Sequence, residues 1–117
     1  MKLLLSILMS FLLLNSCVYN KEKIELPSPE ITYTNYAKNI VGENCLACHI
    51  SGYNTNGTPA GNRNFTTYQG VKQAVDDGVF KQRVIDGVSP TMPYGLPQLS
   101  QEIKDKLTLW INQGAKE

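Results

Sequence analysis

Residues 45–49, with the sequence Cys-Leu-Ala-Cys-His, constrain this chain more than any other stretch. Residues three and four positions apart lie on one face of a helix, so Cys45, Cys48 and His49 can all reach one flat object. The spacing C-x-x-C-H is the attachment signal for c-type haem. In such a site the two thiols bind the haem vinyl groups and the imidazole is the proximal ligand of the iron. We therefore expect one covalently bound haem c (heme c).

A C-x-x-C pair can also belong to a zinc site, a redox dithiol or a structural disulfide. A zinc site needs further Cys or His ligands, but His49 is the only histidine of the chain. A thioredoxin-like dithiol needs a βαβ setting, whereas the sequence after His49 is helical and rich in turn residues. A third alternative is a lipoprotein without haem in which Cys45 and Cys48 form a structural disulfide.

The N-terminal residues have the pattern of an export signal. Lys2 gives a positive start, and residues 3–14 form an apolar run that is too short to span a bilayer. The run ends in residues 14–17 (LNSC), which resemble a bacterial lipobox, where the cysteine is lipidated and becomes the mature N-terminus. We expect residues 1–16 to be a lipoprotein signal peptide and the lipid on Cys17 to hold the protein on a membrane of the bacterial cell envelope, facing the periplasm. The alternative is an ordinary signal-peptide cysteine or one that forms a disulfide.

The charge of the mature chain excludes one class of partner. Removal of residues 1–16 takes away Lys2, so the 11 basic residues of the whole chain become ten, equal to the ten acidic residues. A chain without net positive charge offers no basic field for nucleic acid. About a hundred mature residues can bury one modest core. We expect one domain over residues 33–117, joined to the membrane by a flexible tether over residues 17–32, which show no helical or alternating period.

The domain is expected to be all-α. Apolar spacing and capping residues predict helices over residues 33–44, 66–78, 80–86 and 100–114. Thr66 and Ser100 are the expected N-caps of the second and fourth of these helices. Trp110 lies on the apolar face of the last helix and is expected to pack against the first helix.

Residues 89–97 form a loop stiffened by three prolines, and the loop contains Met92. Pro93 biases Met92 toward an extended conformation, and the prolines reduce the entropy lost when the loop is fixed. A thioether is a soft ligand, and His/Met ligation raises the reduction potential of haem iron. The other two methionines lie in the signal, so Met92 is the only candidate of its kind in the mature protein. We expect it to be the distal ligand; the alternative is a core-filling role.

With its attachment motif, methionine loop and closing helix, the chain resembles the small monohaem class I cytochromes c, of the lipoprotein kind found in bacterial envelopes. The resemblance covers about residues 33–117, and the ending over residues 110–115 (WINQGA) is typical of many members. It implies a small cytochrome c fold of about four short helices wrapped around one covalent haem, with the first and last helices crossing beside the motif.

The same resemblance implies roles for individual residues. Cys45 and Cys48 would hold the haem, His49 would be the proximal ligand and Met92 the distal one. The family uses a proline carbonyl downstream of the motif to accept a hydrogen bond from the proximal imidazole. Pro59 is the matching proline here. Phe65 takes the place of the aliphatic residue that packs on the haem.

These features imply an electron carrier and not an enzyme. The iron would cycle between Fe(III) and Fe(II) with both axial ligands bound. Its partners would be redox proteins that bind transiently through a small interface, and the carrier itself would be a monomer. The alternatives are a haem-c gas sensor, which needs an open distal site, and an accessory haem subunit of a periplasmic dehydrogenase or oxidase complex.

Overall fold

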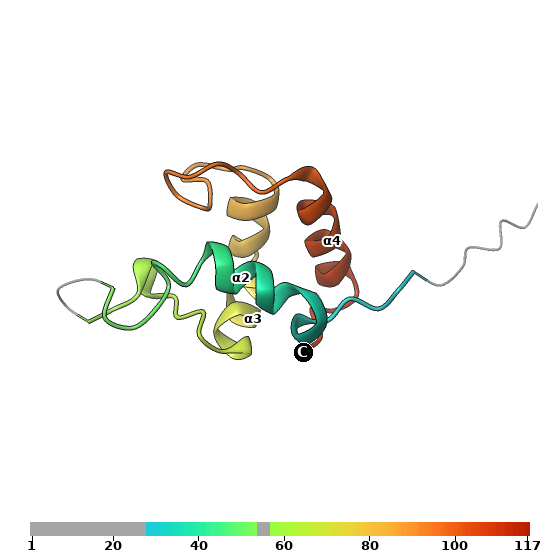
Figure 1. Ribbon diagram of the computed structural model, residues 1–117, viewed down its shortest axis with the longest axis horizontal. Helices are drawn as coiled ribbons and strands as arrows, with labels where there is room; N and C mark the ends of the chain where they lie inside the picture. The colour runs from blue at the N-terminus through green and yellow to red at the C-terminus, as the bar shows by residue number, and fades with distance from the viewer. Residues whose placement is uncertain (1–27, 54–56) are drawn as a thin grey trace, which may run out of the picture.

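The computed structural model describes residues 28–53 and 57–117, and this part of the chain is helical with no strand (Figure 1). The prediction of an all-α fold is confirmed for it. The elements, in chain order, are η2 (Tyr33–Ala37), α2 (Lys38–Asn44), η3 (Ala60–Asn62), α3 (Tyr68–Asp76), η4 (Lys81–Ile85) and α4 (Gln101–Asn112). η2 and η4 are single π-helical turns, and η3 is a 3₁₀ turn.

The parts of the chain that were expected to serve export and tethering lie largely outside the described residues. These are the signal peptide over residues 1–16, the lipidated Cys17 and the tether as far as residue 27. None of the helices in the described ranges has both the length and the hydropathy that a membrane crossing requires.

η2 and α2 are continuous and together form the helix predicted over residues 33–44. Thr32 caps its start, because the Thr32 hydroxyl accepts from the Asn35 backbone N–H at 3.1 Å and the Asn35 side chain accepts from the Thr32 N–H at 2.8 Å. Tyr33, Ala37 and Val41 recur every four residues and are buried. This helix therefore presents one apolar stripe to the core, as its sequence predicts.

α4 has the predicted ends. The Ser100 hydroxyl accepts from the Ile103 N–H at 3.4 Å, and Gly114 takes the left-handed conformation (φ 94°) just beyond the helix. Leu107 and Trp110 point inward and are fully buried. α4 therefore contributes two fully buried side chains to the core.

Trp110 connects four parts of the domain. Its ring centroid lies 6.3 Å from that of Tyr33 in η2 and 6.3 Å from that of Phe80, which precedes η4. Its indole N–H donates to the Lys116 carbonyl at 2.8 Å. The predicted packing of Trp110 against the first helix is confirmed.

The first of the two middle helices, α3, starts one residue later than predicted, whereas residues 79–85 are helical and match the helix predicted over residues 80–86 to within one residue. The N-cap of α3 is Thr67 and not Thr66, because the Thr67 hydroxyl accepts from the Gly70 N–H at 3.2 Å. The Thr66 hydroxyl instead donates to the Asn64 side chain at 2.7 Å, which removes it from capping. Phe80, the first residue of the predicted third helix, precedes η4 and is buried in the core.

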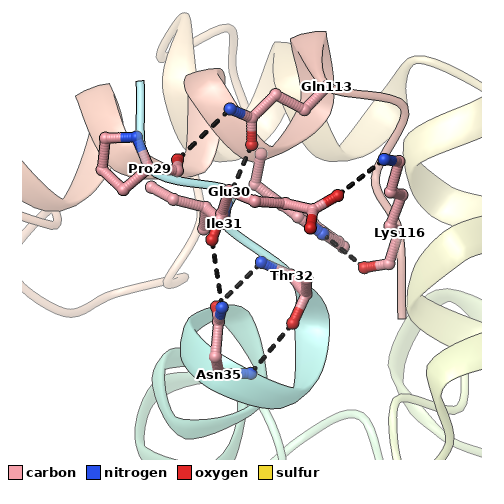
Figure 2. Close-up of polar contacts among 8 residues, drawn as sticks. Pro29, Glu30, Ile31, Thr32, Asn35, Gln113 and Lys116 are labelled. Carbon is pink, nitrogen blue, oxygen red and sulfur yellow. Dashed lines mark hydrogen bonds and ion pairs between the residues drawn. The ribbon is translucent and has the colours of Figure 1, made fainter. Parts of the chain in front are cut away.

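The last residues of the segment predicted as a tether are docked on the end of α4 (Figure 2). The Gln113 side chain donates to the Pro29 carbonyl at 3.3 Å and accepts from the Ile31 N–H at 2.9 Å. Lys116 forms an ion pair with Glu30, with 2.6 Å between nitrogen and oxygen. In the described part of the chain, contacts with the helical domain therefore start near Pro29, ahead of the boundary predicted at residue 33. The docked segment is extended and held by side chains from the other end of the chain, so it has no local period.

Replacing Gln113 by Ala tests this docking. The change removes both hydrogen bonds to the Pro29–Ile31 backbone, and we expect a loss of about 1–2 kcal/mol in the free energy of unfolding. Denaturant unfolding measures it. Gln73→Ala, on the exposed face of α3, is the matched control. Equal stabilities of the two variants would show that the docked segment contributes nothing.

Candidate cofactor site

The C-x-x-C-H motif forms a turn that continues directly from α2. The N–H groups of Cys48 and His49 both donate to the Cys45 carbonyl, at 3.2 and 2.9 Å. The three functional side chains of the motif therefore lie on one turn, as their spacing predicts. Cys45 and Cys48 are free thiols in this structure, not a disulfide.

The thiol of Cys45 lacks the property that a redox dithiol needs. Burial, and second the charge of the neighbouring Cys48, raises the pKa of Cys45 to about 11. Redox-active C-x-x-C motifs instead lower the pKa of the attacking cysteine. The environment at the end of α2 keeps Cys45 protonated at neutral pH, which disfavours the dithiol alternative.

The imidazole of His49 is fixed from two sides. Its Nδ1 lies 3.0 Å from the Arg63 carbonyl oxygen. A carbonyl only accepts, so Nδ1 carries the hydrogen and Nε2 keeps a free lone pair for a metal. The Phe65 ring stacks on the imidazole, with 4.4 Å between centroids and 18° between planes. The Phe65 N–H also donates to the His49 carbonyl at 2.9 Å, which ties the two residues together.

Pro59 does not supply the acceptor for His49, so that prediction is wrong. The Pro59 carbonyl accepts from the Asn62 N–H at 3.0 Å, within the turn that η3 makes. Gly61 and Asn62 take left-handed conformations there (φ 60° and 57°). The chain turns back after the proline and reaches the imidazole at Arg63. A Gly-Asn pair is a turn signal, and it is the one sequence feature that pointed to this detour.

The methionine loop is held mainly by Arg83. The Met92 N–H donates to the Arg83 carbonyl at 3.0 Å. The Arg83 guanidinium donates to the Val88 carbonyl at 3.3 Å and to the Ser89 carbonyl. Arg83 of η4 thus holds the loop through both its backbone carbonyl and its guanidinium group. Sequence reasoning missed Arg83, because bonds from a short turn into an irregular loop leave no periodic pattern.

A cavity of about 350 Å³ collects the residues of these two regions, and this volume is in the range of ligand pockets in proteins. Its walls are largely apolar, with Ala74, Val79, Phe80 and Val84 among them. Of the predicted site residues, five line it: Cys45, Cys48, His49, Phe65 and Met92. Pro59 is not among the lining residues, and Cys17 lies outside the described part of the chain.

The donor set fits a flat, mostly apolar metal macrocycle. It offers two thiols for attachment, one imidazole with a free Nε2 and one thioether, in an apolar enclosure. Over the described ranges, no three or more His, Cys, Asp or Glu side chains gather where they could hold a metal ion together. A pair of one imidazole and one thioether, such as His49 and Met92, would bind a metal only where a macrocycle provided the remaining ligands.

Comparison with protein-family models, with curated proteins and with solved structures finds no match to this chain. The cavity and its residues are therefore the basis for any function of this chain. The Cys45–His49 motif and Met92 are far apart in the sequence, and both line this one cavity.

Gly70 controls how closely α3 approaches the segment that carries Arg63 and Phe65. A Cβ on Gly70 would overlap the backbone carbonyl of Asn64, which no side-chain rotation relieves. We expect Gly70→Ala to lower the free energy of unfolding by about 1–3 kcal/mol.

Gly42 provides the matched control, since a Cβ there has no atom within 4 Å and the residue is exposed in α2. Gly42→Ala is expected to raise stability by about 0.5–1 kcal/mol, because Ala loses less backbone entropy in a helix. Denaturant midpoints of both variants give the comparison. If Gly70→Ala proves as stable as Gly42→Ala, the close approach of α3 is contradicted.

Proposed function

We propose that this chain is a small class I-type cytochrome c that carries single electrons through one covalently bound haem. The observation that carries the proposal is the cavity, which brings together two thiols, the only imidazole of the chain and the Met92 thioether. Each of these groups has a defined task in such a carrier. The all-α character of the described residues is consistent with that fold.

The residues would divide the work as follows. Cys45 and Cys48 would hold the haem through their sulfurs, and His49 Nε2 and the Met92 sulfur would bind its iron. The haem, when bound, supplies the Fe(III)/Fe(II) couple. Arg63 accepts the hydrogen bond from Nδ1 and thereby keeps the His49 ring in one orientation and one tautomer.

The surroundings favour electron transfer over chemistry on a substrate. His49 is fixed by Arg63 and Phe65, and Met92 is fixed by Arg83, so both ligand positions are held before and after a change of charge. The largely apolar walls lower the local dielectric, which would favour the less charged ferrous state and raise the potential. The proposal is therefore a carrier and not an enzyme.

The setting we propose is the periplasmic side of a bacterial membrane. A signal over residues 1–16 and lipidation of Cys17 would leave a short tether that ends near Pro29, where the chain docks on Gln113. The carrier would work as a monomer between membrane-associated or periplasmic redox proteins. A tether limits its diffusion to the neighbourhood of the membrane, where such partners meet it.

Met92→Ala tests the ligand set. In the haem-loaded protein we expect the far-red Met-to-ferric-iron absorption band to disappear and the ferrous form to bind carbon monoxide, because the distal position is opened. Leu96→Ala, at another residue that lines the cavity, is the control and should keep the band. A Met92→Ala spectrum identical to that of the wild type would rule out this ligand. Ready carbon monoxide binding by the wild type would favour the gas-sensor alternative.

Arg83→Ala tests how the ligand loop is held. Loss of the bonds to Val88 and Ser89 is expected to weaken the loop by about 1–2 kcal/mol, so the far-red band is lost at a lower denaturant concentration than in the wild type. Lys81→Ala removes a cation of the same turn whose ion-pair partner is Asp86, and it should leave the band in place. If both variants lose the band at the same denaturant concentration, Arg83 has no particular hold on the loop.

A further inference from the structure

The exposed hydrophobic side chains of this protein are not scattered. In the described part of the chain, the large ones lie in the loop after the motif and in or directly before the methionine loop: Ile50, Tyr53, Val88, Tyr94 and Leu96. Three of them, Tyr53, Tyr94 and Leu96, also line the cavity while they are 52%, 75% and 62% exposed. A side chain that is both exposed and lining lies at the mouth of the cavity. We call these three residues the mouth patch.

The loops that carry the mouth patch are free of charge. Residues 44–62 and 87–101 contain no Asp, Glu, Lys or Arg. Two arginines line the cavity itself, and both are engaged: Arg63 pairs with Asp77 at 3.0 Å, and the Arg83 guanidinium donates to loop carbonyls. The other exposed ion pairs of the described residues, such as Lys106 with Glu102 at 2.8 Å, lie outside these loops. The mouth of the cavity therefore offers apolar contacts to a partner, and these loops carry no charged side chain that would steer the partner toward it.

The same loops are well placed for contact with another protein. In Figure 1 the loop after α2 (green) and the loop after η4 (orange) lie at one side of the helices, and the segment from residue 28 enters at the other side. A partner at the mouth would therefore lie away from the point where residue 28 enters the domain. The mouth is also where the cavity opens to the surface, so a partner there would be close to a redox group bound inside.

We infer that the mouth patch is the docking surface for a redox protein that presents an apolar, uncharged face around its own cofactor. The inference rests on the proposed function. A charged partner face would lose hydration against Tyr53, Tyr94 and Leu96 without gaining a counter-charge. Two apolar faces gain free energy from the area they bury, and aromatic residues are enriched at the centres of interfaces. Docking of this kind is expected to be nearly independent of ionic strength.

Electron self-exchange between oxidised and reduced copies of the haem-loaded protein tests the inference. A second copy is a suitable probe, because it presents the same uncharged face. NMR line broadening in mixtures of the two oxidation states gives the exchange rate. We expect the wild-type rate to change by less than about twofold between low and high salt, since no charges steer the encounter.

Two variants with the same change in net charge locate the contact. Leu96→Lys puts a cation in the mouth patch, and Asn112→Lys puts one at the exposed C-terminal end of α4, a helix that contributes none of the described lining residues. Leu96→Lys should slow self-exchange by about tenfold at low salt and recover in part at high salt, because salt screens the repulsion between facing lysines. Asn112→Lys should leave the rate near that of the wild type.

The outcomes separate this inference from the proposed function. Equal rates for Leu96→Lys and Asn112→Lys, or a wild-type rate that depends strongly on salt, would overturn the docking surface while a redox-active haem leaves the carrier proposal intact. A protein without bound haem would overturn both. A stable dimer in sedimentation would assign the mouth patch to a second copy, and vesicle binding lost in Leu96→Lys would assign it to a bilayer. Either result would overturn the partner we infer.

Discussion

Burial of the Trp110 indole is the interaction on which the rest of the structure depends. The ring packs near Tyr33 and Phe80 and donates to the Lys116 carbonyl, so one side chain fixes α4 against η2, the start of η4 and the C-terminal residues. Loss of such a buried indole generally costs about 3–5 kcal/mol. Phe80 also lines the cavity. Part of the cavity wall therefore depends on the packing of α4, near the C-terminus, against η2, near the start of the domain.

The site itself depends on hydrogen bonds between irregular segments. Two loops provide the proposed axial ligands, and neither loop has regular structure over most of its length. Arg63 and Phe65 fix the His49 ring, while the carbonyl and guanidinium groups of Arg83 fix the Met92 loop. The helices set the distance between the loops, and these few bonds set the orientation of the ligands. Such preorganisation suits a group that must change charge with little movement.

Local patterns in the sequence predicted much of this arrangement. The spacing of Cys45, Cys48 and His49 placed three side chains on one turn, and Ser100 and Gly114 marked the ends of α4. What the sequence did not reveal are bonds between distant segments. Gln113 holds residues near Pro29, and the Arg63 carbonyl takes the place expected for Pro59. An amide side chain or a backbone carbonyl that bonds across the fold leaves no period, cap or motif to read.

The absorption spectrum of the matured protein, with and without acid-acetone extraction, tests covalent haem attachment and ligation by His49 and Met92 together. We expect the haem to stay with the protein through extraction, and both oxidation states to be low-spin, with the far-red Met-to-ferric-iron band in the oxidised spectrum. Haem that is lost on extraction, or a matured protein without haem, would contradict the assignment of Cys45 and Cys48. A covalent but high-spin haem would contradict the pairing of His49 with Met92.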